Sequence, residues 1–337
     1  MKHQFLVVSL FLGVLASERS SMIAAADEPA LEKVQTLALE GPAGGLDHLA
    51  LDVKRARLFV ANTVNGSLDV VDLKAGRLLK QIPGQGRIRG IAYSPTDDRI
   101  FVGNGAGGVC NLFDGGDFAL LRSVSLGDDA DNVRFNPKTG RIYVVHSDQE
   151  LSIISAKDGS IRSPIPVPGP IGGFQLESSR PRMYVNSKVG QVVVINLDTD
   201  HIVDRFPVAP ATDNSALAID EPNHRLFVGC RREPSLVVID SDTGKVVARL
   251  SIPGDVDDVS YDANRERILA SCGAGAIAVI QRVDADHYES IATIRTTPGA
   301  RTSIYDPDAG RLYVAVPRRE DGPNRDRPEV WVYQARP

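Results

Sequence analysis

The chain has 337 residues, of which 42% are hydrophobic and 24% are charged, and this composition excludes a largely disordered protein. Its formal net charge of -5 gives no electrostatic attraction toward nucleic acid or an anionic membrane, so we expect neither as a partner. Beyond the N-terminus, no apolar run approaches the roughly 20 residues that a membrane-spanning helix needs. We therefore expect a globular protein that does not span a membrane.

The N-terminus has the pattern of an export signal. Lys2 provides a positive start, and the apolar run that follows, Phe5 to Ala16, is too short to cross a bilayer. Small residues suited to cleavage end at Ala26, with Ala16 as an alternative site. We predict a signal peptide over residues 1–26 and a periplasmic or secreted mature protein.

A short motif, an arginine followed by apolar residues typical of strands, then recurs through the chain. Its seven copies begin at Arg57, Arg99, Arg141, Arg182, Arg225, Arg267 and Arg311. Successive copies are 41 to 44 residues apart. A period of that length, with several short strands in each repeat, is typical of β-propeller blades.

Each repeat can supply four antiparallel strands. In the first repeat, alternating and β-branched apolar residues predict strands over 49–51, 57–61, 68–71 and 78–82. Asp and Gly residues suited to tight turns separate the third strand from the fourth, as between Asp72 and Gly76. The sequence therefore predicts an all-β, seven-bladed propeller with four strands in each blade.

The last repeat lacks a fourth strand, because the chain ends soon after Val330 to Tyr333. Residues 33–42 have the pattern of the missing strand, including the Gly-Pro end that other fourth strands share. We predict that residues 31–45 complete the seventh blade and close the ring, which removes its exposed edges. The domain would then span residues 27–337, with the blades over about 46–334.

The repeats also resemble a known family. Phe59-Val60-Ala61-Asn62, Phe101-Val102-Gly103-Asn104 and the Tyr-Val pairs of later repeats are similar to the motif of YVTN-family β-propeller repeat proteins. The resemblance extends over essentially the whole mature chain, although no copy is a literal Tyr-Val-Thr-Asn. It implies an exported bacterial protein with a binding or scaffold role.

Residues at the start of the innermost strands should surround the mouth of the central channel. Ten residues before each motif arginine lie Asp47, Arg89, Asp131, Gly172, Ser215, Asp257 and Arg301. Nine residues before it lie His48, Gly90, Asn132, Gly173, Ala216, Asp258 and Thr302. The residues eight before it are nearly all apolar and belong to the core.

These two positions predict an asymmetric polar surface. We take the ligand-binding candidates to be Asp47, His48, Arg89, Asp131, Asn132, Asp257, Asp258 and Arg301. One interpretation is a rim in which Arg89 and Arg301 neutralise carboxylates such as Asp47. Another is a site for a small anionic ligand or a protein partner, bound without turnover, in which the two arginines hold an anion.

A catalytic alternative is a metal-assisted lactonase or related hydrolase. Asp47, Asp131, Asp257 and Asp258 could hold a divalent cation such as calcium, with His48 as the base. Otherwise we expect no cofactor. The chain has no Cys-x-x-Cys-His motif for covalent haem. Its single tryptophan, Trp331, does not match the recurring tryptophans of quinone-cofactor propellers.

Three cysteines, Cys110, Cys230 and Cys272, are an odd number for an exported protein. Cys230 and Cys272 occupy the same repeat position in neighbouring blades, whose packed sheets should lie about 10 Å apart and so beyond disulfide reach. We predict three unpaired, buried thiols.

Overall fold

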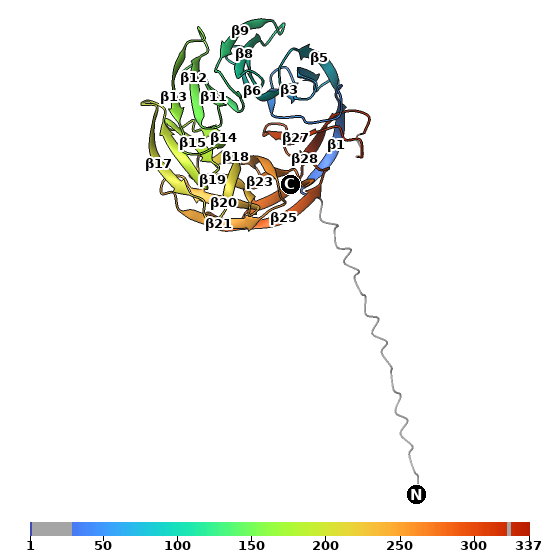
Figure 1. The fold of residues 1–337 in the computed structure, drawn as a ribbon. Coiled ribbons are helices and arrows are strands. Elements are labelled where there is room, and N and C mark those ends of the chain that lie inside the picture. Colours follow the sequence, from blue (N-terminus) through green and yellow to red (C-terminus); the bar gives the residue numbers. More distant parts are fainter. Residues whose placement is uncertain (2–28, 322–324) are drawn as a thin grey trace.

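The computed structural model describes Met1, residues 29–321 and residues 325–337. The described residues form seven four-stranded antiparallel sheets arranged in a ring (Figure 1). The predicted all-β, seven-bladed propeller is therefore confirmed. The predicted signal peptide lies outside the described residues, apart from Met1. No helix in the described part of the chain is long and apolar enough to cross a membrane.

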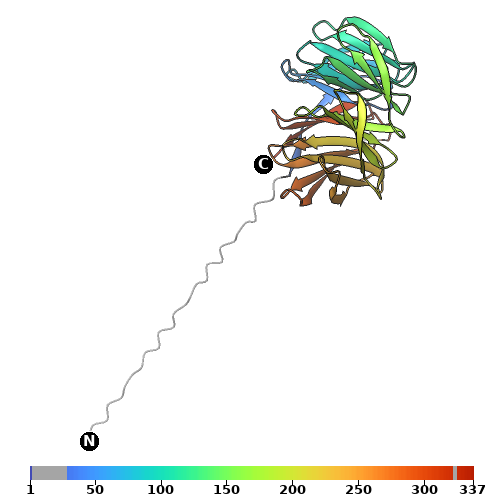
Figure 2. The ribbon, with the colours of Figure 1, turned by 90° about the vertical axis from the view of Figure 1, so that its left-hand side faces the viewer.

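Every blade orders its strands from the channel outward, with the innermost strand first (Figure 1). Figure 2 shows the ring from its side. Blade one contains β2 (Leu49–Asp52), β3 (Arg57–Asn62), β4 (Ser67–Asp72) and β5 (Arg77–Pro83). Blade two contains β6 (Ile88–Ser94), β7 (Arg99–Asn104), β8 (Val109–Asp114) and β9 (Leu120–Ser125). Blade three contains β10 (Val133–Asn136), β11 (Arg141–His146), β12 (Glu150–Ser155) and β13 (Ile161–Pro166).

The remaining blades repeat this order. Blade four contains β14 (Ile171–Leu176), β15 (Arg182–Ser187), β16 (Gln191–Asn196) and β17 (His201–Pro207). Blade five contains β18 (Thr212–Asp220), β19 (Arg225–Arg232), β20 (Ser235–Asp240) and β21 (Val246–Ser251). Blade six contains β22 (Val256–Asp262), β23 (Arg267–Cys272), β24 (Ala276–Arg282) and β25 (Tyr288–Arg295). Blade seven contains β26 (Ser303–Asp306), β27 (Arg311–Val316), β28 (Glu329–Ala335) and β1 (Leu31–Ala38).

The motif arginine begins the second strand of each blade and is held by carboxylates in several of them. Arg57 donates two hydrogen bonds to Asp52 Oδ2, at 3.0 and 2.6 Å, across the turn from β2 to β3. Arg99 reaches Asp114 on the other side of its strand at 2.8 Å. The apolar residues after the arginine are buried between neighbouring blades. The repeat motif therefore combines an arginine–carboxylate pair at the start of the second strand with buried apolar residues along the rest of that strand.

The N-terminal strand closes the ring as predicted. β1 pairs with β28 in antiparallel register, with Thr36 opposite Trp331, so the outer strand of blade seven comes from the opposite end of the chain. Beyond β1, Leu39 donates a backbone hydrogen bond of 2.9 Å to Pro328. Leu37 and Leu39 are fully buried against blades one and seven. Closure thus satisfies the backbone of β28 and buries apolar surface at once.

The three cysteines are unpaired and buried, which confirms the prediction. Burial raises the pKa of each thiol to about 12. They are inert parts of the core.

Candidate functional site

The channel mouth is built by residues at the start of the innermost strands, such as Arg89 in β6 and Asp257 in β22, or just before it, such as Asp47 before β2. Asp47 and Ala61 are joined by a backbone hydrogen bond of 2.9 Å, and Ala61 donates another, of 3.1 Å, to the carbonyl of His48. In blade three the same two bonds join Asp131 and Asn132 to Val145. In these two blades the antiparallel pairing therefore extends two residues ahead of the inner strand, and it fixes the direction of these side chains.

A pocket of about 100 Å³ occupies the mouth. It is lined by Asp47, His48, Arg89, Asp131, Asn132, Ile171, Gly172, Gly173, Lys188, Ser215, Arg231, Asp257 and Arg301. Seven of the eight ligand-binding candidates therefore lie in one pocket. The eighth, Asp258, lines the channel on the other side of His48.

The rim arginines pair with carboxylates, but not with Asp47. Arg89 Nη1 lies 3.1 Å from Asp131 Oδ2 in the next blade. Arg301 Nε lies 3.0 Å from Asp257 Oδ2 in the preceding blade, and Arg301 Nη1 lies 3.0 Å from Asp255 Oδ2. Both arginines thus turn away from blade one. The pairing with Asp47 that the sequence suggested is absent from the ion pairs of the described residues.

Two further cations reach the mouth from the ends of second strands and the loops that follow them. Arg231, at the end of β19, lies 2.5 Å from Asp257 Oδ1 and donates a hydrogen bond of 3.0 Å to the Val256 carbonyl. Lys188 follows β15, and no carboxylate lies within 4.0 Å of its ammonium among the described residues. Both residues lie outside the inner strands, so comparing inner-strand positions does not find them. They could have been predicted because the loops between second and third strands lie on the same face of the ring as the mouth.

His48 lies between two carboxylates at the centre of the channel. Its Nε2 is 3.7 Å from Asp47 Oδ1, and its Nδ1 is 3.4 Å from Asp258 Oδ2, which also accepts a hydrogen bond of 2.9 Å from the Ser303 amide. Burial alone would lower the pKa of His48, but Asp258 and Asp47 outweigh it and raise the pKa to about 10. His48 is therefore a cation at neutral pH.

The pKa of Asp47 is raised as well, but for a carboxyl group this favours the neutral form. Burial raises its pKa to about 7, with His48 opposing the shift and the nearby carboxylates of Asp131 and Asp257 adding to it. The Asp47 carboxyl is thus partly neutral at physiological pH, although it sits beside an imidazolium.

This geometry does not fit the calcium site considered from the sequence. No three His, Cys, Asp or Glu side chains in the described ranges are placed to hold a metal ion together. Asp131 is paired with Arg89, Asp257 with two arginines, and Asp258 with His48. A protonated His48 also lacks the free ring nitrogen that a general base needs.

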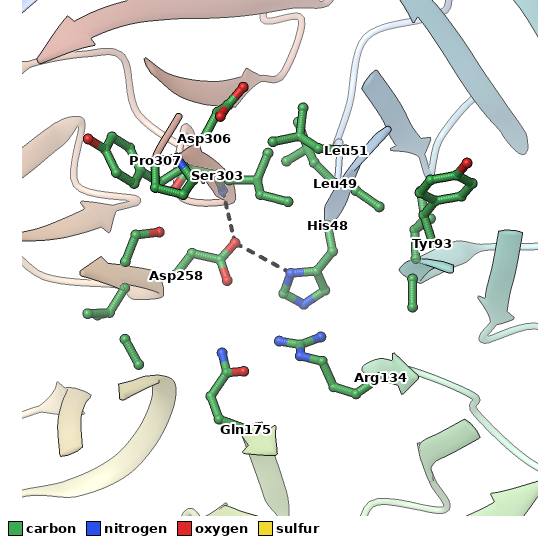
Figure 3. Close-up of a pocket in the computed structure, with 18 of the residues that line it drawn as sticks. His48, Leu49, Leu51, Tyr93, Arg134, Gln175, Asp258, Ser303, Asp306 and Pro307 are labelled. Atoms are coloured by element: carbon green, nitrogen blue, oxygen red, sulfur yellow. Dashed lines mark hydrogen bonds and ion pairs between the residues drawn. The ribbon is translucent and has the colours of Figure 1, made fainter. Parts of the chain in front are cut away.

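A larger chamber of about 610 Å³ lies in the channel on the far side of His48. Figure 3 shows the side chains of His48, Asp258, Arg134 and Gln175 facing one another across its centre. Sequence reasoning missed Arg134 and Gln175. A signal was present, because side chains two residues apart on a strand face the same way. Both residues lie seven before a motif arginine, two after the position of His48.

The sequence matches no protein-family model. It is 20% identical over 268 residues to the uncharacterized protein YncE of Salmonella typhi and to that of Salmonella typhimurium (strain LT2). The alignment covers 78% of this chain and 66% of those proteins. Two solved structures have the same fold at 13% identity. U3-55K has a TM-score of 0.76, and the match covers 89% of this chain and 98% of that one. The WD40 repeats of RRP9 have a TM-score of 0.77, and the match covers 91% of this chain and 100% of that one.

Proposed function

We propose that this β-propeller repeat protein binds a small anion at its channel mouth and does not convert it. The observation that supports this proposal is Lys188, the one cation of the mouth pocket that has no ion pair within the described chain. The other four cations of the lining each pair with carboxylates in the pocket or beside it: His48 with Asp258, Arg89 with Asp129 and Asp131, and Arg231 and Arg301 with Asp255 and Asp257. An unpaired ammonium in a concave site favours an anionic ligand.

The anion has a defined place on the side of blades four and five. There the rim positions are Gly172, Gly173 and Ser215, which carry no charge to occupy the pocket. Lys188 lies at the same pocket without an ion-pair partner in the described chain, so its ammonium is available to a ligand. The volume of about 100 Å³ equals that of roughly three water molecules, which suits a phosphate or a small carboxylate.

Asn132 adds a second requirement. Its Oδ1 is buried and accepts no hydrogen bond from the described residues. A buried acceptor without a donor is costly, so a ligand that carries a hydroxyl or amine beside its anionic group would relieve it. We therefore favour a small hydroxy acid, or a phosphate monoanion, over a simple inorganic anion without protons. A protein partner is less well matched, because these groups lie inside a pocket rather than on a broad face.

The arrangement of His48 and Ser215 argues against catalysis, because neither is placed to act as a general base or an activated nucleophile. The ring nitrogens of His48 face two carboxylates, and the raised pKa keeps both of them protonated at neutral pH. Ser215, the serine of the mouth pocket, donates its hydroxyl to the Asp213 carbonyl at 3.3 Å rather than to a base. An unactivated hydroxyl is a weak nucleophile. With the predicted signal peptide, the proposal is of a binding protein that acts in the periplasm or outside the cell.

The test is calorimetric titration of the mature protein with phosphate, lactate and malate at low ionic strength. We expect binding of at least one of them, weakened about tenfold or more in Lys188→Gln and Arg301→Gln, because each variant loses one charge-assisted contact. Lys74→Gln is the matched control, since Lys74 is exposed in the turn after β4 on the opposite face of the ring. A panel of lactones, with and without calcium, should show no hydrolysis. Turnover that disappears in His48→Ala would overturn the proposal.

A further inference from the structure

The chamber beyond His48 opens on the face of the ring opposite the mouth. Val53 and Pro307 line it; both follow an inner strand in the turn toward the second strand, and both are exposed, Val53 to 52%. The chamber volume of about 610 Å³ lies within the range of roughly 300–1,000 Å³ that is usual for small-molecule sites. It is thus reachable from solvent and large enough for an organic molecule.

Three of the four charged side chains in the chamber already have partners. His48 and Asp258 pair with each other. Asp306 Oδ1 accepts two backbone hydrogen bonds of 3.1 Å within its own turn. The fourth is Arg134, which has no carboxylate within 4.0 Å among the residues that the structure describes. The chamber therefore contains one arginine that no carboxylate pairs with in the described chain.

Arg134 is nevertheless held in place. Its Nη1 donates a hydrogen bond of 2.9 Å to the Val133 carbonyl, and its guanidinium stacks over the ring of Phe174 at 5.4 Å from the centroid. Burial lowers the pKa of Arg134, and the opposing effect of the carboxylates of Asp258 and Asp131 is smaller. A guanidinium has five N–H donors, and this is the one hydrogen bond that it donates within the described chain. The remaining donors are available to a ligand, and Figure 3 shows the guanidinium directed to the middle of the chamber.

The chamber wall is apolar and partly aromatic. One repeat position, six residues before the motif arginine, supplies much of it. Its members in the wall are Leu51, Tyr93, Phe135, Ile219, Tyr261 and Tyr305. A second position contributes alanines in three blades, Ala50, Ala92 and Ala218, and their small size leaves the central space open. The chamber thus offers extended apolar surface around Arg134, whose guanidinium has no ion-pair partner among the described residues.

From these features we infer that the chamber is a second binding site, distinct from the mouth, for a carboxylic acid with an aromatic or aliphatic body. The carboxylate would accept hydrogen bonds from the free N–H groups of Arg134, which present a fork that matches two carboxylate oxygens. The body of the ligand would rest on the aromatic and aliphatic wall, where apolar area is removed from water. The His48–Asp258 pair separates this site from the mouth pocket.

The experiment uses three probes on the mature protein: 3-phenylpropionate, its alcohol 3-phenylpropanol, and propionate. We expect 3-phenylpropionate to bind in calorimetric titration, and both partial mimics to bind about tenfold more weakly or worse, because each lacks one half of the match. This comparison needs no variant, so a folding defect cannot obscure it. Equal affinity for the acid and the alcohol, or no binding of the acid at millimolar concentration, would overturn the inference.

Variants then locate the site. Arg134→Gln should weaken 3-phenylpropionate about tenfold or more, whereas Arg134→Lys, which keeps the charge, should retain a larger share of the affinity. Lys188→Gln, at the mouth, should leave 3-phenylpropionate binding unchanged. If Lys188→Gln abolishes it and Arg134→Gln does not, the acid binds at the mouth and the chamber inference is wrong. Loss of phosphate and hydroxy-acid binding alone would affect only the proposed function.

Discussion

The mouth and the chamber lie in one channel and on the same inner strands, yet they are opposite kinds of site. In the mouth pocket, charged side chains from neighbouring blades cross and pair, and about 100 Å³ remains. In the chamber, one unpaired arginine faces an apolar space of about 610 Å³. The difference teaches how a repeat fold creates asymmetry. Each depth of the channel corresponds to one position of the repeat, so a change in one blade alters one depth only.

Arg89 and Arg134 illustrate this contrast. Both come from the start of an inner-strand segment, and both are near Asp131. Arg89 lies at the rim, where the Asp131 carboxylate is 3.1 Å away. Arg134 lies deeper, between Ala92 and Gln175 at the same repeat position, where the Val133 carbonyl and the ring of Phe174 hold it. The same residue type is therefore a structural partner at one depth and a candidate ligand anchor at the next.

The largest expected effect removes both sites together. A protein that begins after Gly45 lacks β1 and leaves the edge of β28 unpaired, along with the apolar surface that Leu37 and Leu39 cover. We expect an insoluble protein, or one with a strongly lowered melting temperature, because an exposed apolar strand edge promotes aggregation. Solubility and thermal melting against the full mature chain check this. A truncated protein that melts like the full chain would contradict the role of β1 in closure.

Asp258 and Asp255 compare the buried centre with the rim. Asp258→Ala leaves His48 buried without its nearest partner, which should lower the free energy of unfolding by about 3–5 kcal/mol. Asp255 is 42% exposed, and both arginines that it contacts also pair with Asp257. Asp255→Ala should therefore change stability by less than about 1 kcal/mol. Urea unfolding at neutral pH measures both; equal losses would show that burial does not distinguish these carboxylates.

The pH dependence of stability tests the charge of His48. Its folded pKa, about 10, is above the ordinary value of 6.5, so its contribution is fully present below pH 6.5 and is lost as pH rises through 10. We expect the free energy of unfolding to fall between these values by an amount on the order of a few kcal/mol. His48→Gln should flatten this part of the profile. A wild-type profile that is already flat from pH 6.5 to 10 would contradict a protonated His48.

The smallest effect separates the two sites by their response to salt. Raising ionic strength from about 0.01 to 0.15 M shortens the Debye length from roughly 30 to 8 Å, which screens partly exposed charges more than buried ones. The affinity for phosphate at the mouth should fall several-fold, whereas the affinity for 3-phenylpropionate in the chamber should change less. Titration at the two salt concentrations checks this. A larger loss for 3-phenylpropionate would reverse the assignment of the two environments.

Much of the fold could be read from spacing alone. The motif arginines from Arg57 to Arg311 predict seven blades, and the missing strand after Tyr333 predicts closure by the N-terminal segment. Spacing also predicted most of the mouth, because equal distances from the arginine mean equal depth in the channel. It did not identify Lys188 and Arg231, which come from the ends of second strands and the loops after them, or Arg134, which lies one residue beyond the last position that was compared.

Sequence by itself thus determined the repeat, the ring and the depth of each inner-strand residue, since these follow from a local period and from the alternation of side chains along a strand. Only the tertiary structure decided which charges meet. Arg301 pairs with Asp257 and not with Asp47, and His48 is positive because two carboxylates flank it. Such choices depend on separations of a few ångströms between blades and on burial, to which electrostatic interactions are steeply sensitive and a repeat period is not.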